Sequence, residues 1–144
     1  MTSSAEDPDS LSTDPLPPLP PRAIVAGHGA FPDGMVSAVH QITGFGNVFL
    51  PMSNAGLTGE DIESRLRSRA TDSQVKVFFT DLPGGSATMA VRRMMRDTPG
   101  IVLVTGTNLA TLLEFVFRSD ERPGEAARHA AEKGRGAIAV QGED

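Results

Sequence analysis

Short apolar runs alternate with helix-patterned segments along most of this chain, and this alternation limits the possible fold more than any other feature. The apolar runs are 23–26, 47–51, 75–80, 101–105 and the shorter 137–140. Helical spacing or helix-start signals mark 33–43, the stretches after 58 and after 85, 109–117 and 125–133. Strands that alternate with helices favour a parallel sheet covered on both faces. We therefore predict an α/β domain with an open, mainly parallel sheet.

Local signals set the expected ends of these helices. The stretch Thr58-Gly59-Glu60-Asp61 resembles a capping box, and Asn108 suits the N-cap of helix 109–117. Ser86 is expected to cap the helix that follows it, and Gly134 to end helix 125–133. The apolar positions expected to face the core include Met35, Val36, Val39, Ile42, Ile62, Leu66, Met89, Ala90, Met94, Leu109, Leu112, Leu113 and Val116.

The last apolar run, Ala137–Val140, is short and rich in small residues. We expect a fifth strand there, at an edge of the sheet. The pattern leaves its direction open, and it also leaves open whether it joins the sheet of a neighbouring subunit.

The first 22 residues differ in composition from the rest of the chain. They contain six prolines among Ser, Thr, Asp and Glu, and few large apolar residues. Such a segment buries too little apolar surface to offset the entropy of ordering. We predict a disordered, acidic tail over 1–22 and one domain over 23–141, a size typical of single domains.

Charge and composition exclude several classes of protein. Residues 1–21 hold four acidic residues and no Lys or Arg, so they carry −4 of the net charge of −5. The nearly neutral remainder, without Trp or Tyr, gives no basic surface for nucleic acid. The chain has no cysteine, no apolar stretch near 20 residues and no signal-peptide pattern, so we expect a cytoplasmic protein.

Two strand tips carry residues suited to chemistry. His28 follows the first apolar run, between Gly27 and Gly29, and Asp81 follows the third. In open α/β sheets, ligands bind beyond the carboxyl ends of the strands. A neutral imidazole is a competent nucleophile, and a carboxylate that accepts a hydrogen bond from one ring nitrogen orients it. We therefore predict that His28 and Asp81 act together.

The residues after Asp81 favour an anion site. Gly84, Gly85 and Ser86 stand at the expected start of a helix, where free N–H groups and the helix dipole attract negative charge. Gly29 allows the backbone to approach a bulky group closely. Since positioning and electrostatics dominate phosphoryl transfer, these residues together indicate a site that holds a phosphoryl group.

The chain resembles the mannose-family enzyme IIA domain of the bacterial sugar phosphotransferase system. The resemblance rests on residues 24–29 (IVAGHG), 81–86 (DLPGGS) and 104–109 (VTGTNL), and on the order of elements from 24 to about 140. Family members often have Thr or Ser where this chain has Gly27, and Pro where it has Ala87.

The resemblance implies a phosphoryl carrier that uses no cofactor. His28 would accept phosphate from the carrier HPr and pass it to a IIB partner, with Asp81 as the orienting carboxylate. Gly84, Gly85 and Ser86 would form the phosphoryl-binding loop. The family fold has four parallel strands, and a fifth, antiparallel strand is exchanged within a homodimer. The link to the membrane components IIC and IID would pass only through partners.

Other interpretations remain open at this point. The same chemistry would serve a regulatory phosphoprotein of an incomplete phosphotransferase system. A related phosphoryl donor for dihydroxyacetone kinase shares the fold, but its motifs differ. A non-catalytic small-molecule or nucleotide-binding module is a further class, although the glycine-rich nucleotide motifs are missing. His40 and His129 are expected on the surface, and the three histidines lack the spacing of metal ligands.

Overall fold

The sheet has four strands, all parallel, in the order β2-β1-β3-β4. The computed structural model describes residues 20–143. The strands are β1 (Ala23–Gly27), β2 (Phe49–Ser53), β3 (Val77–Thr80) and β4 (Val102–Val104). The helices are α1 (Phe31–Thr43), α2 (Gly59–Ser73), α3 (Ser86–Met95), α4 (Leu109–Phe117) and α5 (Pro123–Gly136), with a 3₁₀ turn η2 (Gly46–Val48) before β2. The predicted open parallel sheet is confirmed.

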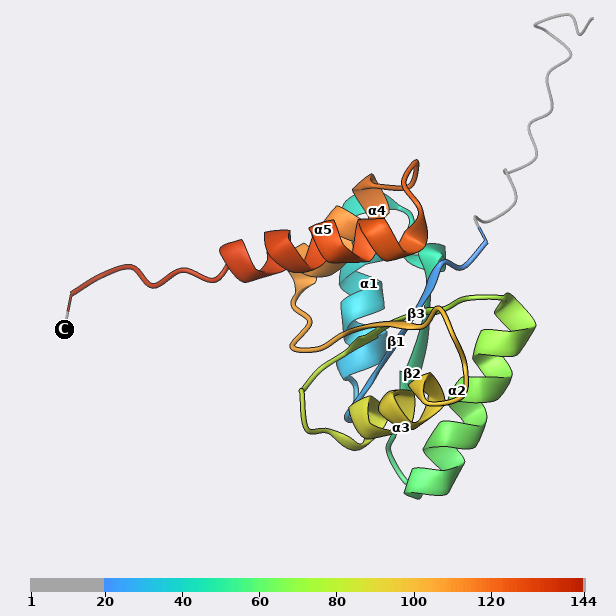
Figure 1. Cartoon of the computed structure of the whole chain (residues 1–144). Helices are drawn as coiled ribbons and strands as arrows, with labels where there is room; N and C mark the ends of the chain where they lie inside the picture. The colour runs from blue at the N-terminus through green and yellow to red at the C-terminus, as the bar shows by residue number, and fades with distance from the viewer. Residues whose placement is uncertain (1–19, 144) are drawn as a thin grey trace, which may run out of the picture.

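Helices cover both faces of the sheet (Figure 1). The helices α1, α4 and α5 pack on one face, where Val25 and Phe79 meet Phe115. The helices α2 and α3 pack on the other, where Ile24 and Phe78 share a core with α2 and α3 side chains. Successive residues of β1 and β3 therefore point into opposite cores, and this double burial explains their continuous apolar runs.

Two of the expected helix caps are confirmed. The Thr58 hydroxyl accepts a hydrogen bond from the Asp61 N–H at 3.1 Å, and the Asn108 side chain accepts one from the Thr111 N–H at 3.0 Å. In each case a side-chain oxygen satisfies an N–H group that the helix itself leaves unpaired. These caps fix the points at which α2 and α4 begin.

Some predictions of buried helix positions and of strand bounds are wrong. Ile42 and Met89 are exposed. Ile42 lies in the last turn of α1, and the buried stripe of α3 instead runs through Ala87, Ala90, Val91 and Met94. The predicted strand 47–51 lies two residues further along the chain, because residues 46–48 form the 3₁₀ turn. The other predicted core positions on these helices are buried or half-buried.

Gly134 does not end the last helix, since α5 runs on to Gly136. A Cβ atom at position 134 would lie 1.8 Å from Thr111 Oγ1, so the glycine allows α5 to pack closely on α4. The Asn108 amide also donates to the Gly134 carbonyl at 2.8 Å. A glycine signal that predicted a helix end thus reflects close packing between two helices.

The fifth strand predicted at Ala137–Val140 is not seen. These residues follow α5, lie outside the sheet and are exposed, with Val140 94% exposed. The chain leads away from the body after α5 (Figure 1), and β4 pairs only with β3. Over residues 20–143 the sheet has four strands.

Most of the predicted tail, residues 1–19, lies outside the described residues. Arg22 belongs to the packed body: its N–H donates to the Val48 carbonyl at 2.8 Å, and its guanidinium lies 5.1 Å from the centre of the Phe115 ring. Across residues 20–143, no helix combines the length and the apolar character needed to cross a membrane.

Candidate functional site

The strand order reverses between β1 and β3, and the predicted site residues lie at that point. The chain leaves β1 toward β2 on one side and later returns to form β3 on the other side of β1. Such a reversal opens a crevice beyond the carboxyl ends of the two strands. His28 follows β1 and Asp81 follows β3, so the sheet itself brings them together.

His28 and Asp81 are in direct contact. The backbone N–H of His28 donates to Asp81 Oδ2 at 2.8 Å, and the ring Nδ1 lies 2.8 Å from the same oxygen. Because an ionised carboxylate only accepts, Nδ1 carries the hydrogen, and the neutral ring then has its free lone pair on Nε2. The His28 side chain is 54% exposed, whereas that of Asp81 is 10% exposed.

Asp81 is held as a carboxylate. Its burial favours the neutral acid, but the hydrogen bonds from the His28 backbone and ring outweigh that effect, so the pKa of Asp81 lies below its ordinary value. Its second oxygen, Oδ1, is buried and has no hydrogen-bond partner among the described residues. The carboxylate therefore directs its charge mainly to His28.

Two glycines leave room for this pair. A Cβ atom at Gly27 would lie 2.6 Å from the Asp81 carboxyl carbon, and one at Gly85 would lie 3.1 Å from His28 Cε1. Gly27 thus makes room for the carboxylate, and Gly85 lets the start of α3 approach the imidazole. Gly29 has φ of +52°, a backbone conformation that glycine adopts without strain.

Helix α3 begins beside the imidazole. Gly85 is its N-cap and supplies no side chain, so the first N–H groups of α3 lack side-chain acceptors. The buried hydroxyls of Thr80 and Thr88 are hydrogen-bonded at 2.7 Å, and the Thr88 hydroxyl also bonds the Leu82 carbonyl. These contacts fix the start of α3 against the tip of β3. Gly84 lies in the same loop and is exposed.

Ser86 does not cap α3, contrary to the prediction. It is the first residue of the helix, and its hydroxyl accepts a hydrogen bond from the Asn54 amide at 2.8 Å. Asn54 lies just after β2, and its sequence context, Asn54-Ala55-Gly56, is typical of a turn rather than of a site. Asn54 follows the carboxyl end of β2, and this position is the signal that could have identified it as a site residue.

The other histidines lie elsewhere. His40 Nδ1 accepts the Gly46 N–H at 3.2 Å, and His129 Nδ1 lies 2.8 Å from Glu121 Oε1. Both are exposed, as predicted. Within residues 20–143, no three His, Asp or Glu side chains gather in an arrangement that would hold a metal ion.

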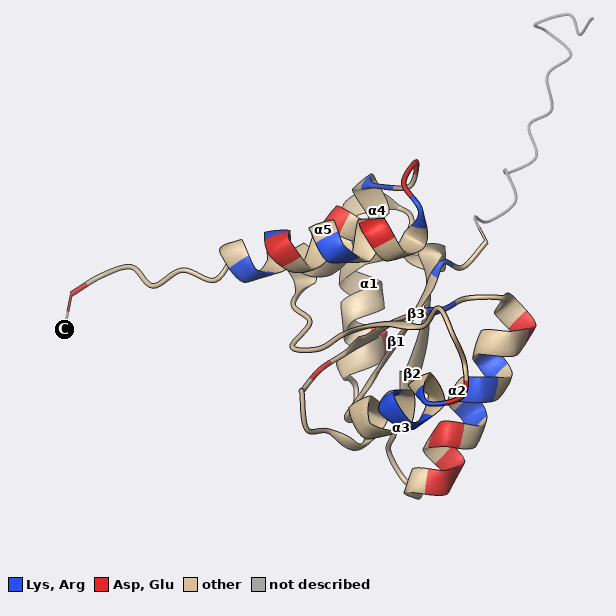
Figure 2. Ribbon diagram, viewed as in Figure 1, with Lys and Arg blue, Asp and Glu red and all other residues tan. Residues whose placement is uncertain are grey.

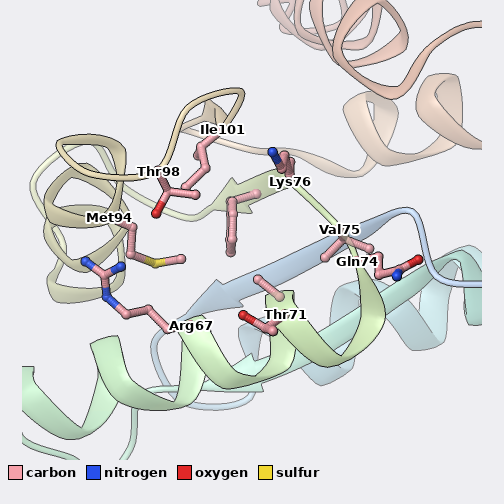
Figure 3. A pocket seen from close by; sticks show the side chains of 10 residues that line it. Arg67, Thr71, Gln74, Val75, Lys76, Met94, Thr98 and Ile101 are labelled. Atoms are coloured by element: carbon pink, nitrogen blue, oxygen red, sulfur yellow. The ribbon is translucent and has the colours of Figure 1, made fainter.

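A hollow of about 400 Å³ lies at the opposite end of the sheet (Figure 3). Its lining includes Gln74, Val75 and Lys76, which precede β3, and Ile101, which precedes β4. The Arg67 guanidinium on its rim is already paired with carboxylates. This hollow therefore lies away from His28 and Asp81, and the charged group on its rim is already paired.

The fold and the paired residues define the class of protein. This is an open parallel α/β domain that presents a histidine, oriented by a carboxylate, at its topological switch point. Residues 22–132 match the EIIA-man family, which is described as "PTS system fructose IIA component". No curated protein matches the chain in sequence.

Solved structures of similar fold include three that are described as parts of phosphotransferase systems. Component EIIA from Streptococcus agalactiae has a TM-score of 0.74 at 23% identity, over 83% of this chain and 95% of that one. The mannose/sorbose-specific IIA subunit from Enterococcus faecalis has a TM-score of 0.74 at 21% identity, over 88% and 98%. A putative phosphotransferase-system permease from Klebsiella pneumoniae has a TM-score of 0.70 at 22% identity, over 83% and 89%.

The chain belongs to the mannose-type enzyme IIA family. It is a phosphoryl-carrier component of a sugar phosphotransferase system, that is, a histidine phosphotransfer protein. Members of this family work between HPr and a IIB component.

Proposed function

We propose that His28 is the histidine that carries the phosphoryl group. The observation that supports this most directly is the 2.8 Å contact between His28 Nδ1 and Asp81 Oδ2, beneath a ring that is half exposed. His129 also has a half-exposed ring with a carboxylate oxygen, Glu121 Oε1, 2.8 Å from its Nδ1, but Glu121 is shared with Arg118. Neither His129 nor His40 lies beyond the carboxyl end of a strand, since they lie within α5 and α1. His28 is therefore both oriented and within reach of a donor.

The attacking atom is Nε2 of His28. Its lone pair forms a bond to phosphorus as the bond from phosphorus to the donor histidine breaks, and the donor leaves as a neutral imidazole. The His28 ring then carries phosphate on Nε2 and hydrogen on Nδ1, with a positive charge that the Asp81 carboxylate stabilises. Transfer to the acceptor histidine reverses these steps.

The start of α3 supports the phosphoryl oxygens. Gly84, Gly85 and Ser86 offer backbone N–H groups and the positive end of the helix dipole, and Gly85 lies beside the imidazole. Gly29 leaves the other side of His28 free of a side chain. The transferred group bears negative charge on its oxygens, which these donors stabilise by electrostatics.

The donor is HPr and the acceptor is a IIB component, and the transfer takes place in the cytoplasm to drive sugar uptake. The sugar is bound by membrane components that this chain reaches only through its partner. The chain itself therefore needs a surface for two proteins in turn, and the exposed His28 tip serves both.

Phosphorylation by enzyme I, HPr and phosphoenolpyruvate tests this assignment. The wild-type protein should gain one acid-labile phosphate, and His28→Gln should gain none. Matched variants His40→Gln and His129→Gln should be labelled like the wild type. Labelling of His28→Gln, or phosphorus–nitrogen coupling at Nδ1 rather than Nε2, would contradict the proposal.

We also propose that the segment Ala137–Val140 adds to the sheet of a second copy. Strand β4 is at the edge of the sheet, and a groove of about 440 Å³ runs beside it, lined by β4 and by Ala127 and Ala131 of α5. Ile138 and Val140 are apolar and exposed in one chain. An antiparallel strand from a partner would pair the free edge of β4 and bury both side chains.

Sedimentation of the full chain tests this exchange. The wild type should sediment as a dimer, and the double variant Ile138→Asp, Val140→Asp as a monomer. Gln141→Asp adds a negative charge directly after the segment, outside the proposed strand, and should remain dimeric. A monomeric wild type, or a dimeric double variant, would overturn the proposed exchange.

A further inference from the structure

The tip of β2 brings a third strand to the site. Asn54 follows β2, and its backbone N–H donates to the Gly27 carbonyl at 2.9 Å, one residue before His28. Its side-chain amide donates to Ser86 Oγ at 2.8 Å. Asn54 therefore joins the His28 strand to the first residue of α3 through two different groups.

The loop that carries Asn54 is held at both ends. At its start the backbone is fixed to Gly27, and at its end the Thr58 side chain caps α2. One turn into α2, Glu63 pairs with Arg93 of α3 at 2.6 Å, which ties α2 to α3. The Asn54 amide is thus positioned by the surrounding fold rather than by its own loop alone.

The hydrogen bond from Asn54 determines whether the Ser86 hydroxyl serves as a donor or an acceptor toward other groups. A serine hydroxyl has one hydrogen to donate and two lone pairs that accept. The Asn54 amide occupies a lone pair, so the hydroxyl hydrogen stays available for an external acceptor. Ser86 is exposed at the start of α3, next to Gly85, which approaches the His28 ring.

We propose that Asn54 is a positioning residue for phosphoryl transfer, which acts by holding the Ser86 hydroxyl as a donor to the phosphoryl group. The proposal rests on the proposed function, since it requires the phosphoryl group to lie on His28. Asn54 does not itself touch the reacting atoms. It sets the orientation of a hydroxyl that strengthens the electrostatic support at the helix start.

A double-mutant cycle on the full-length protein tests this role. Asn54→Ala and Ser86→Ala should each slow phosphoryl transfer from phosphorylated HPr by about 10-fold. The double variant should be no slower than the single ones, because both substitutions remove the same donor. Asn54→Asp should be slower than Asn54→Ala, since its carboxylate would accept the hydroxyl hydrogen and add negative charge beside the phosphate.

Asn47→Ala, which removes an exposed asparagine before β2, should transfer at the wild-type rate. Multiplicative losses in the double variant, or an unchanged rate in Asn54→Ala, would overturn the role of Asn54. Thermal unfolding of each variant separates a loss of positioning from a loss of fold. Failure of the proposed function would appear differently, as labelling that persists in His28→Gln.

Discussion

The two ends of the sheet differ in how completely their polar groups are paired. At the amino end, beside the hollow in Figure 3, Arg67 binds Glu63 and Asp97, and the Lys76 ammonium donates to the Pro99 carbonyl. At the carboxyl end, the ring of His28 is half exposed and Asp81 Oδ1 has no partner among the described residues.

This difference indicates which end is built to receive a charged group. Leaving a buried oxygen or a helix start without partners has a free-energy cost that folding alone does not recover. The unpaired N–H groups at the start of α3 are donors that the oxygens of a phosphoryl group would accept from. Asp81 Oδ1 is an acceptor and instead adds negative charge beside the His28 ring. In the ribbon of Figure 2, residues of both charge signs lie along α2 and α5.

The largest expected effect comes from Asp81→Asn at the carboxyl end. The amide favours the wrong tautomer of His28 and removes the charge that stabilises the phosphorylated ring. We expect phosphoryl transfer from HPr to slow by about 10²- to 10⁴-fold, measured by single-turnover kinetics. Arg67→Met at the amino end should leave that rate unchanged. Equal losses in both variants would remove the distinction between the two ends.

Gly27→Ala should have an intermediate effect. The added methyl group would meet the Asp81 carboxylate, so the carboxylate must shift away from the imidazole. We expect a transfer rate reduced by about 10-fold and a free energy of unfolding lowered by about 1–3 kcal/mol. Gly84→Ala, which adds a methyl group in open space, should be nearly as stable as the wild type in urea unfolding. A wild-type transfer rate in Gly27→Ala would contradict the prediction, because it would show that Asp81 can shift from His28 without loss of activity.

The smallest effects concern acid and salt. The pKa of Asp81 lies below its ordinary value through its bonds to His28, and that of Asp97 is lowered chiefly by its bonds to Arg67. A lowered folded-state pKa stabilises the fold above the ordinary value of about 3.9, and this contribution is lost as the pH falls through the folded value.

Carboxyl titrations by NMR should separate the two ends. Salt at about 1 M should move the pKa of exposed Asp97 toward its ordinary value and leave that of Asp81 nearly unchanged, because short-range bonds in a buried site are poorly screened. If Asp81 responds to salt as strongly as Asp97, the carboxyl end is no better shielded than the surface.

Most of the framework could be predicted from local patterns. Burial of parallel strands on both faces gives continuous apolar runs. Thr58 and Asn108 mark helix starts, because their side-chain oxygens accept hydrogen bonds from N–H groups of the first turn. Ser86 has the same side-chain chemistry, but its partner is Asn54, 32 residues away. Capping rules consider near neighbours only, so they predict a helix cap for Ser86 and do not reveal its contact with Asn54.

The amino-acid sequence by itself determined the α/β alternation and the placement of His28 and Asp81 after two apolar runs, because both depend on short-range periodicity. Only the tertiary structure decided that β1 and β3 are neighbours, that Gly27 and Gly85 make room for the pair, and that Gly134 lies inside a helix. The reason is that strand order and close approach depend on contacts between segments far apart in the chain, which no local pattern records.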